Sequence, residues 1–175
     1  VCSSDLLAVS LGMPYTPAAD WVDLYYDGVY RGTYLVSETN AVGSTGVDIT
    51  GMETAYAAVN ADYGGDMITA AAENRYGRTY RYTAGLTEPA DITGGYLLAR
   101  SDTAKAKQDA ANGFVTARGC AMNVQSPAWC GRDAMAYISE YYQAFEDAVY
   151  AQDAAGNYTG YNAETGKYYY EYCDL

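Results

Sequence analysis

The feature that most limits the fold of this chain is a tight turn between two alternating segments. Residues 21–26 alternate in the period-two pattern of a β-strand. Asp27-Gly28 follows, and this dipeptide suits the two positive-φ positions of a hairpin turn. Residues 29–36 return as a second strand, in which Gly32 indicates a bulge or a close backbone approach. The sequence therefore predicts a β-hairpin.

The remaining pattern is one of short strands followed by a long helix. The predicted elements are strands over 47–49, 79–82, 95–99, 114–118 and 121–125, a brief helix over 54–60, and a polar loop or short helix over 101–112. The long helix is indicated by apolar residues spaced three and four apart, namely Ala134, Ile138, Tyr141, Phe145 and Ala148. Strands that precede helices in this way favour the α+β class.

The chain contains no histidine, which narrows its chemistry. Histidine-based nucleophilic catalysis and most catalytic zinc sites are thereby excluded. The cysteines, Cys2, Cys120, Cys130 and Cys173, form no Cys-x-x-Cys pair, so we expect no structural zinc site. A Cys120–Cys130 disulfide in an exported chain and buried free thiols are two open alternatives.

The formal net charge of -12 opposes binding to nucleic acid. Arg75, Arg78 and Arg81 alternate with tyrosines, a pattern that can bind single-stranded nucleic acid, but the overall charge favours a solvated strand face. The sequence also has no apolar run long enough for a membrane-spanning helix. We therefore expect neither a nucleic-acid partner nor a membrane span.

Two loops resemble ligand-binding motifs only in part. Residues 160–167 have five residues between the glycines, where a phosphate loop needs four. Tyr168 follows the lysine, where a phosphate loop has a serine or threonine whose hydroxyl binds magnesium. Residues 153–164 have the length of a calcium loop, but Ala155 and Tyr158 occupy places that need a ligand and a glycine. We interpret both as polar surface turns.

Both ends of the sequence are interpreted as truncations. Residues 1–6 resemble a translated sequencing adapter, and such artefacts are left out of fold reasoning. Residues 7–14 have the pattern of the last turn of a helix, ended by Gly12 and followed by proline. Residues 167–175 begin an aromatic segment that has no terminating signal.

An ordered series of segments closely resembles the CotH kinase family. The segments are Leu-Gly-x-Pro-Tyr-Thr-Pro at 11–17, Val-Asp-Leu-Tyr-x-x-Gly-x-Tyr-Arg-Gly-x-Tyr-Leu-x-x-Glu at 22–38, Val-Asp-Ile at 47–49, Gly-Gly-Tyr-Leu-Leu at 94–98, Ser-Pro at 126–127, Tyr-Ile to Phe at 137–145, and Thr-Gly-Lys-Tyr-Tyr-Tyr-Glu-Tyr at 165–172. The resemblance covers residues 7–175, which it identifies as a partial CotH kinase-like domain.

The resemblance implies an atypical protein-kinase-like fold that transfers the γ-phosphoryl group of ATP, with magnesium, to protein hydroxyls. It also implies an extracellular or cell-surface location, as for spore-coat proteins. The catalytic and metal-binding aspartates of the family lie in Asn-x-Asp-like and Trp-Asp-x-Asp-like stretches that would follow residue 175. We therefore assign no catalytic or metal residue and expect this chain to be inactive by itself.

Glu38 matches the glutamate that follows the hairpin in the family, and it is the one residue predicted to bind the nucleotide. The alternative is a surface carboxylate at the end of a strand. The sequence departs from the family pattern at Asn40, Ala99 and Gln125, where a basic, an acidic and a lysine residue are common. These departures support a second hypothesis, a non-catalytic secreted or cell-surface binding module on the same scaffold.

Overall fold

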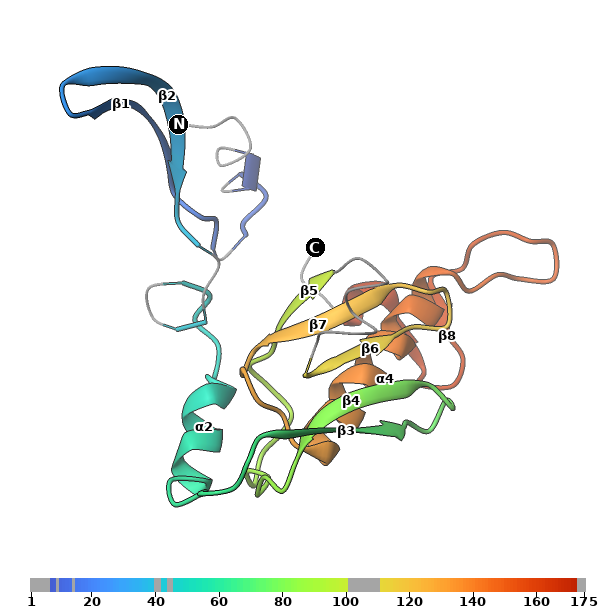
Figure 1. Cartoon of the computed structure of the whole chain (residues 1–175). Coiled ribbons are helices and arrows are strands. Elements are labelled where there is room, and N and C mark those ends of the chain that lie inside the picture. The colour runs from blue at the N-terminus through green and yellow to red at the C-terminus, as the bar shows by residue number, and fades with distance from the viewer. Residues whose placement is uncertain are drawn as a thin grey trace. The chain divides into compact units, whose positions relative to one another are not determined.

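The computed structural model describes residues 7–8, 10–13, 15–39, 42–43, 46–100 and 111–172 (Figure 1). The chain divides into two compact units between Ile49 and Thr50. Its class is mixed α+β, with antiparallel sheets and the helices α2 (Met52–Val59) and α4 (Arg132–Val149), as the sequence predicts. None of the helices among the described residues has the length and apolar character needed to cross a lipid bilayer.

The first unit contains the predicted hairpin. Strands β1 (Ala19–Tyr26) and β2 (Val29–Ser37) pair antiparallel. The turn residues Asp27 and Gly28 have φ values of 50° and 74°, so both adopt the left-handed conformation that the dipeptide predicts.

A bulge interrupts the hairpin at the place that the sequence indicates. Leu24 pairs with Gly32, but the next residue, Tyr25, pairs with Tyr30, so Arg31 is the extra residue. Gly32 has a φ of 115°, which a residue with a side chain rarely adopts. The predicted bulge is confirmed.

The second unit is built on a five-stranded antiparallel sheet with the strand order β3-β4-β6-β7-β5 (Figure 1). Its strands are β3 (Ile68–Glu73), β4 (Thr79–Ala84), β5 (Leu97–Arg100), β6 (Gly113–Val115) and β7 (Ala121–Ser126). The predicted hairpin of 114–118 and 121–125 corresponds to β6 and β7, and Gly119 in its turn has a φ of 83°.

Helix α4 (Arg132–Val149) packs against one face of this sheet. The core between them consists of strand residues Tyr80, Phe114, Met122 and Val124 together with Cys130, Met135 and Ile138. Helix α2 (Met52–Val59) forms a second cluster in which Met52 and Tyr56 contact Ala134. The brief helix predicted over 54–60 is thus confirmed, although it begins two residues earlier.

A small aromatic hairpin follows α4. Strands β8 (Tyr161–Asn162) and β9 (Lys167–Tyr168) pair antiparallel, and a 3-10 turn, η1 (Tyr169–Glu171), comes directly after them. The side-chain amide of Asn162 donates to the carbonyl of Ala144 at 2.9 Å, which attaches the hairpin to α4.

Some predicted elements differ in the structure. The strand predicted over 47–49 is wrong: only Val47 forms an isolated bridge, with Val42. The sequence did not indicate β3, because its central residues are three alanines, which are poor strand formers. The strand predicted over 95–99 begins at Leu97, and residues 101–110 lie outside the described part of the chain.

The set of residues that α4 buries also differs from the prediction. Tyr141 and Phe145 are only half-buried, whereas polar Gln143 and Glu146 are buried. The hydrophobic pattern could not reveal this, because the polar side chains are buried through hydrogen bonds described below.

Candidate functional site

The candidate site lies on the face of the sheet opposite α4. Because Met122 and Val124 face α4, their neighbour Asn123 faces the other way. Residues paired across strands share a face, so Asn123 belongs to a row that crosses the whole sheet. The row runs Ala71, Arg81, Gly113, Asn123 and Ala99, from β3 to β5.

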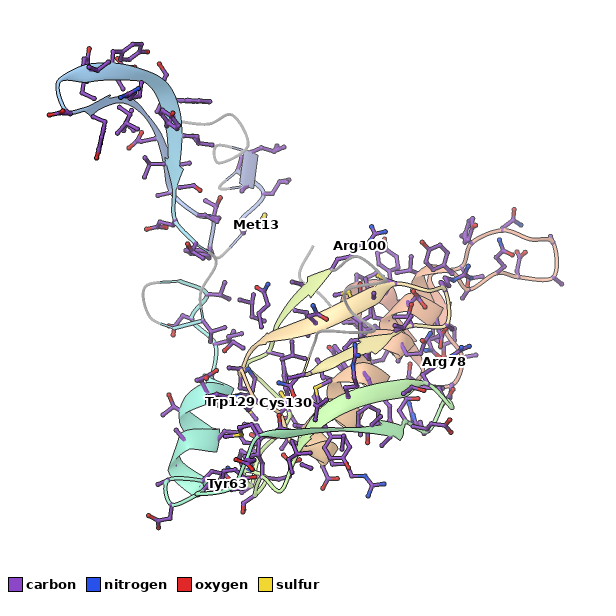
Figure 2. The ribbon with its side chains drawn as sticks, in the orientation of Figure 1. Met13, Tyr63, Arg78, Arg100, Trp129 and Cys130 are labelled. Carbon is purple, nitrogen blue, oxygen red and sulfur yellow. The ribbon has the colours of Figure 1, made fainter. Side chains whose placement is uncertain are left out.

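A hollow of about 470 Å³ occupies the β3-β4-β6 part of this face. Its charged lining consists of Arg78 and Arg81, and Thr79 adds a hydroxyl group. Gly113 lies in the row beside Arg81 and has no side chain to fill the space. Figure 2 shows Arg78 at the end of the β3–β4 hairpin, and its side chain forms no ion pair with any described residue. The hollow therefore presents positive charge to a ligand.

The turn that carries Arg78 is anchored to α4 by one buried amide. The Asn74 side chain is 8% exposed, and its Oδ1 accepts hydrogen bonds from the backbone N–H groups of Tyr76 at 3.1 Å and Arg78 at 3.0 Å. Its Nδ2 donates to Oγ of Ser139, on α4, at 3.0 Å. Gly77, with a φ of 67°, completes the turn. The position of Arg78 is thus set by a contact between distant parts of the chain.

Replacing Asn74 by alanine is expected to lower the free energy of unfolding by about 2 kcal/mol, because the backbone N–H groups of Tyr76 and Arg78 and the buried hydroxyl of Ser139 would lose their partner. Urea denaturation followed by circular dichroism measures the change. The neighbouring Glu73→Ala is the control, since Glu73 is exposed. Equal losses in the two variants would show that Asn74 does not anchor the turn.

The opposite end of the hollow is also fixed by α4. Thr116 donates from Oγ1 to Oε1 of Glu146 at 2.7 Å, and Gln143 accepts a hydrogen bond from the backbone N–H of Ala117 at 2.8 Å. A second bond joins Gln143 Nε2 to Glu146 Oε2 at 3.1 Å. The two ends of the hollow therefore keep a fixed separation.

Two further carboxylates hold the loop before α4. Glu53 accepts a hydrogen bond from the backbone N–H of Ala128 at 2.8 Å. Glu88 accepts a hydrogen bond from the backbone N–H of Asp133 at 2.8 Å, and this bond caps the start of α4. Glu88 also accepts a hydrogen bond from the hydroxyl of Tyr56. Burial, and then the hydrogen bond to Glu88, raise the pKa of Tyr56 above its ordinary value. These acids stabilise the fold.

No cluster of three acidic or cysteine side chains that could hold a metal ion is found among the described residues. Cys120 and Cys130 are free thiols, which favours the alternative of free cysteines over a disulfide between the two. Cys2 and Cys173 lie outside the described residues. Burial raises the pKa of the Cys130 thiol, so it is not a ready nucleophile.

The structure places Glu38 in the first unit, directly after β2. Its Oε2 accepts hydrogen bonds from the backbone N–H of Ala18 at 3.0 Å and from the hydroxyl of Tyr15 at 3.3 Å. The carboxylate therefore closes the base of the hairpin. Its contact with a nucleotide stays a prediction.

One of the two described departures from the family pattern, Ala99, lies on the same face as the hollow, because it pairs directly with Asn123. Gln125 is the extra residue at an irregularity in the pairing of β5 with β7. Sequence reasoning could not bring them together, because their proximity depends on the pairing of β5 with β7. Asn40 lies outside the described residues.

The two loops that resemble ligand motifs in part are closed by their own side chains. Asn162 Oδ1 accepts from the backbone N–H groups of Glu164 at 2.9 Å and Thr165 at 3.2 Å. Asp153 Oδ1 accepts from the N–H groups of Ala155 and Asn157, both at 2.9 Å. The side-chain hydrogen bond from Asn157 is the main reason that the pKa of Asp153 lies below its ordinary value.

Comparisons with known proteins add no relative: no protein-family model, curated protein or solved structure matches the chain.

Proposed function

We propose that the chain forms part of an atypical, kinase-like phosphotransferase domain of the CotH type, which uses ATP and magnesium to phosphorylate protein hydroxyls at the cell surface or outside the cell. One observation carries the proposal beyond the ordered motifs: the hollow on the open sheet face presents Arg78 and Arg81. Phosphoryl transfer depends mainly on positioning and on neutralising phosphate charge. Guanidinium groups suit this role because they bind phosphate oxygens through paired hydrogen bonds.

The hollow suits the polyphosphate of a nucleotide. Its volume of about 470 Å³ lies within the range of small-molecule sites. Arg78 and Arg81 would hold phosphate oxygens, and the hydroxyl of Thr79 would donate to another. ATP supplies the phosphoryl group when bound. The described residues do not gather the carboxylates that magnesium needs, so the metal ligands are not assigned to them.

A second candidate function is a non-catalytic binding module of the cell surface on the same scaffold. It is favoured by the uncharged side chain of Ala99, which lies on the face that would meet the nucleotide, and by the uncharged Gln125 on the adjoining strand β7. The two functions differ in one measurable property, the binding of ATP.

The proposed function is tested by titrating ATP, with and without magnesium, into the 175-residue chain in a calorimeter. We expect binding that Arg78→Ala weakens about tenfold or more, because a charged hydrogen bond to phosphate is lost. The matched control is Arg132→Ala, since Arg132 is an exposed arginine in the first turn of α4 and does not line the hollow.

Absence of ATP binding at millimolar concentration would reject the proposal. The non-catalytic binding module would then be the favoured function. An equal loss of ATP affinity in Arg78→Ala and Arg132→Ala would show that ATP binding depends on the net charge of the chain and not on the hollow.

A further inference from the structure

A second hollow lies between α4, the β3–β4 turn and the β8–β9 hairpin. Its volume is about 220 Å³. Three tyrosines, Tyr137, Tyr141 and Tyr172, contribute to its walls. This hollow is separate from the one that carries Arg78, because the two share no lining residue.

The tyrosine walls are held in place through their hydroxyl groups. Tyr137 donates to the carbonyl of Thr93 at 3.1 Å, and Tyr141 donates to the carbonyl of Tyr172 at 3.2 Å. The hydroxyl of Tyr172 is hydrogen-bonded to Thr165. The rings of Tyr141 and Tyr172 meet edge to face, 5.4 Å apart. The walls are therefore preorganised, and binding need not order them.

The charged groups around the hollow balance one another. Arg75 forms ion pairs with Glu140 at 3.5 Å and with Glu164 at 3.6 Å. Lys167 places its Nζ 5.6 Å from the centre of the Tyr172 ring and forms no ion pair with a described carboxylate. Arg75, Lys167 and Glu140 line the hollow, and Glu164 neutralises Arg75 from beside it. With two cations and two carboxylates so close together, neither an anion nor a cation gains a large net attraction, so a neutral ligand is favoured.

We propose that this hollow binds a neutral pyranose sugar, either free or as one residue of a saccharide. The apolar C–H face of a pyranose ring packs well against tyrosine rings, which offer apolar surface beside polar groups. Its hydroxyls match the rim, where Lys167 donates and Glu140 accepts. The volume lies below the lower limit of about 300 Å³ for larger organic ligands, so the hollow holds one ring.

A peptide aromatic side chain would fill the same walls less well. It would cover Lys167 without giving the ammonium group a hydrogen-bond partner, and burying such a group unpaired is costly. A sugar hydroxyl can accept from Lys167, and the contacts between Glu140 and Arg75 stay in place. The proposal does not depend on the phosphotransferase activity.

The test is saturation-transfer difference NMR on the 175-residue chain with a mixture of methyl glucoside, galactoside, mannoside, xyloside and N-acetylglucosaminide. We expect saturation transfer to at least one pyranoside at millimolar concentration, with a preference for the protons of its apolar face. Lys167→Met is expected to weaken this binding about fivefold or more, which corresponds to one hydrogen bond. Tyr172→Leu removes part of the wall and should weaken it likewise.

The matched control is Tyr158→Leu, because Tyr158 is 68% exposed and does not line the hollow. It should leave sugar binding unchanged, and a two-dimensional amide NMR spectrum reports whether each variant is folded. Arg78→Ala should also leave sugar binding unchanged, and Lys167→Met should leave ATP binding unchanged. These two variants distinguish failure of this proposal from failure of the nucleotide proposal.

Absence of saturation transfer to every pyranoside would overturn the proposal. So would binding of inorganic phosphate that Lys167→Met abolishes, in place of sugar binding, because it would identify the hollow as an anion site. Equal weakening by Lys167→Met and Tyr158→Leu would locate the sugar elsewhere.

Discussion

Replacing Gly95 by alanine is expected to lower the free energy of unfolding by about 3 kcal/mol or more. Gly95 is buried and has a φ of 77°, a conformation that residues with a Cβ rarely adopt. A Cβ atom at this position would also overlap the carbonyl oxygen of Thr50. Since that oxygen belongs to the backbone, it cannot rotate away, and the start of α2 would have to move.

Urea denaturation of the wild-type chain and of the variant measures this effect. Gly94→Ala provides the control, because a Cβ atom at Gly94 meets nothing within 4 Å. It should change the stability by a few tenths of a kcal/mol at most. A Gly95→Ala variant as stable as Gly94→Ala would mean that the chain does not approach itself closely at this turn.

Replacing Glu146 by alanine is expected to destabilise the chain by about 3 kcal/mol. Glu146 is 6% exposed and accepts hydrogen bonds from Thr116 and Gln143. Both donors are buried, so the Thr116 hydroxyl would lose its acceptor and the Gln143 amide would lose one of its two. The β6–β7 turn would then lose its attachment to α4, and the hollow on the open sheet face would lose one fixed end.

The neighbouring substitution Asp147→Ala is the control for Glu146→Ala. Asp147 is exposed, and its carboxylate accepts a hydrogen bond from Gln143 at 2.9 Å. Thermal and urea unfolding should show a much smaller loss for Asp147→Ala. If both variants lose the same stability, the buried network contributes no more than a surface contact does.

The elements that depend on local chemistry could be predicted from the sequence. Asp27-Gly28 fixed the position of the first hairpin, because few dipeptides accept positive φ twice. The spacing of Ala134, Ile138 and Ala148 located α4. Strand β3 could not be predicted, because its alanines are held in place by pairing with β4 and not by their own preference.

The candidate site depends on contacts between distant residues, which explains why sequence reasoning found so little of it. The sequence pattern of Arg78 and Arg81 favours a solvated strand face, and nothing local places Arg81 beside Gly113. Asn74 and Ser139 are 65 residues apart, so their hydrogen bond could not be foreseen. The one available signal was Asn74 itself, an amide residue just before a glycine turn.

The strand order of the sheet has a consequence for its synthesis. β5 precedes β6 and β7 in the chain, but its neighbour in the sheet is β7. Because a nascent chain leaves the ribosome amino terminus first, β5 emerges before any partner strand for it exists. Leu98, which packs against the core, stays exposed until β7 and α4 have followed. Cotranslational folding can assemble β3 with β4 early, but it cannot cover β5 until β7 and the part of α4 that carries Met135 and Ile138 have left the ribosome.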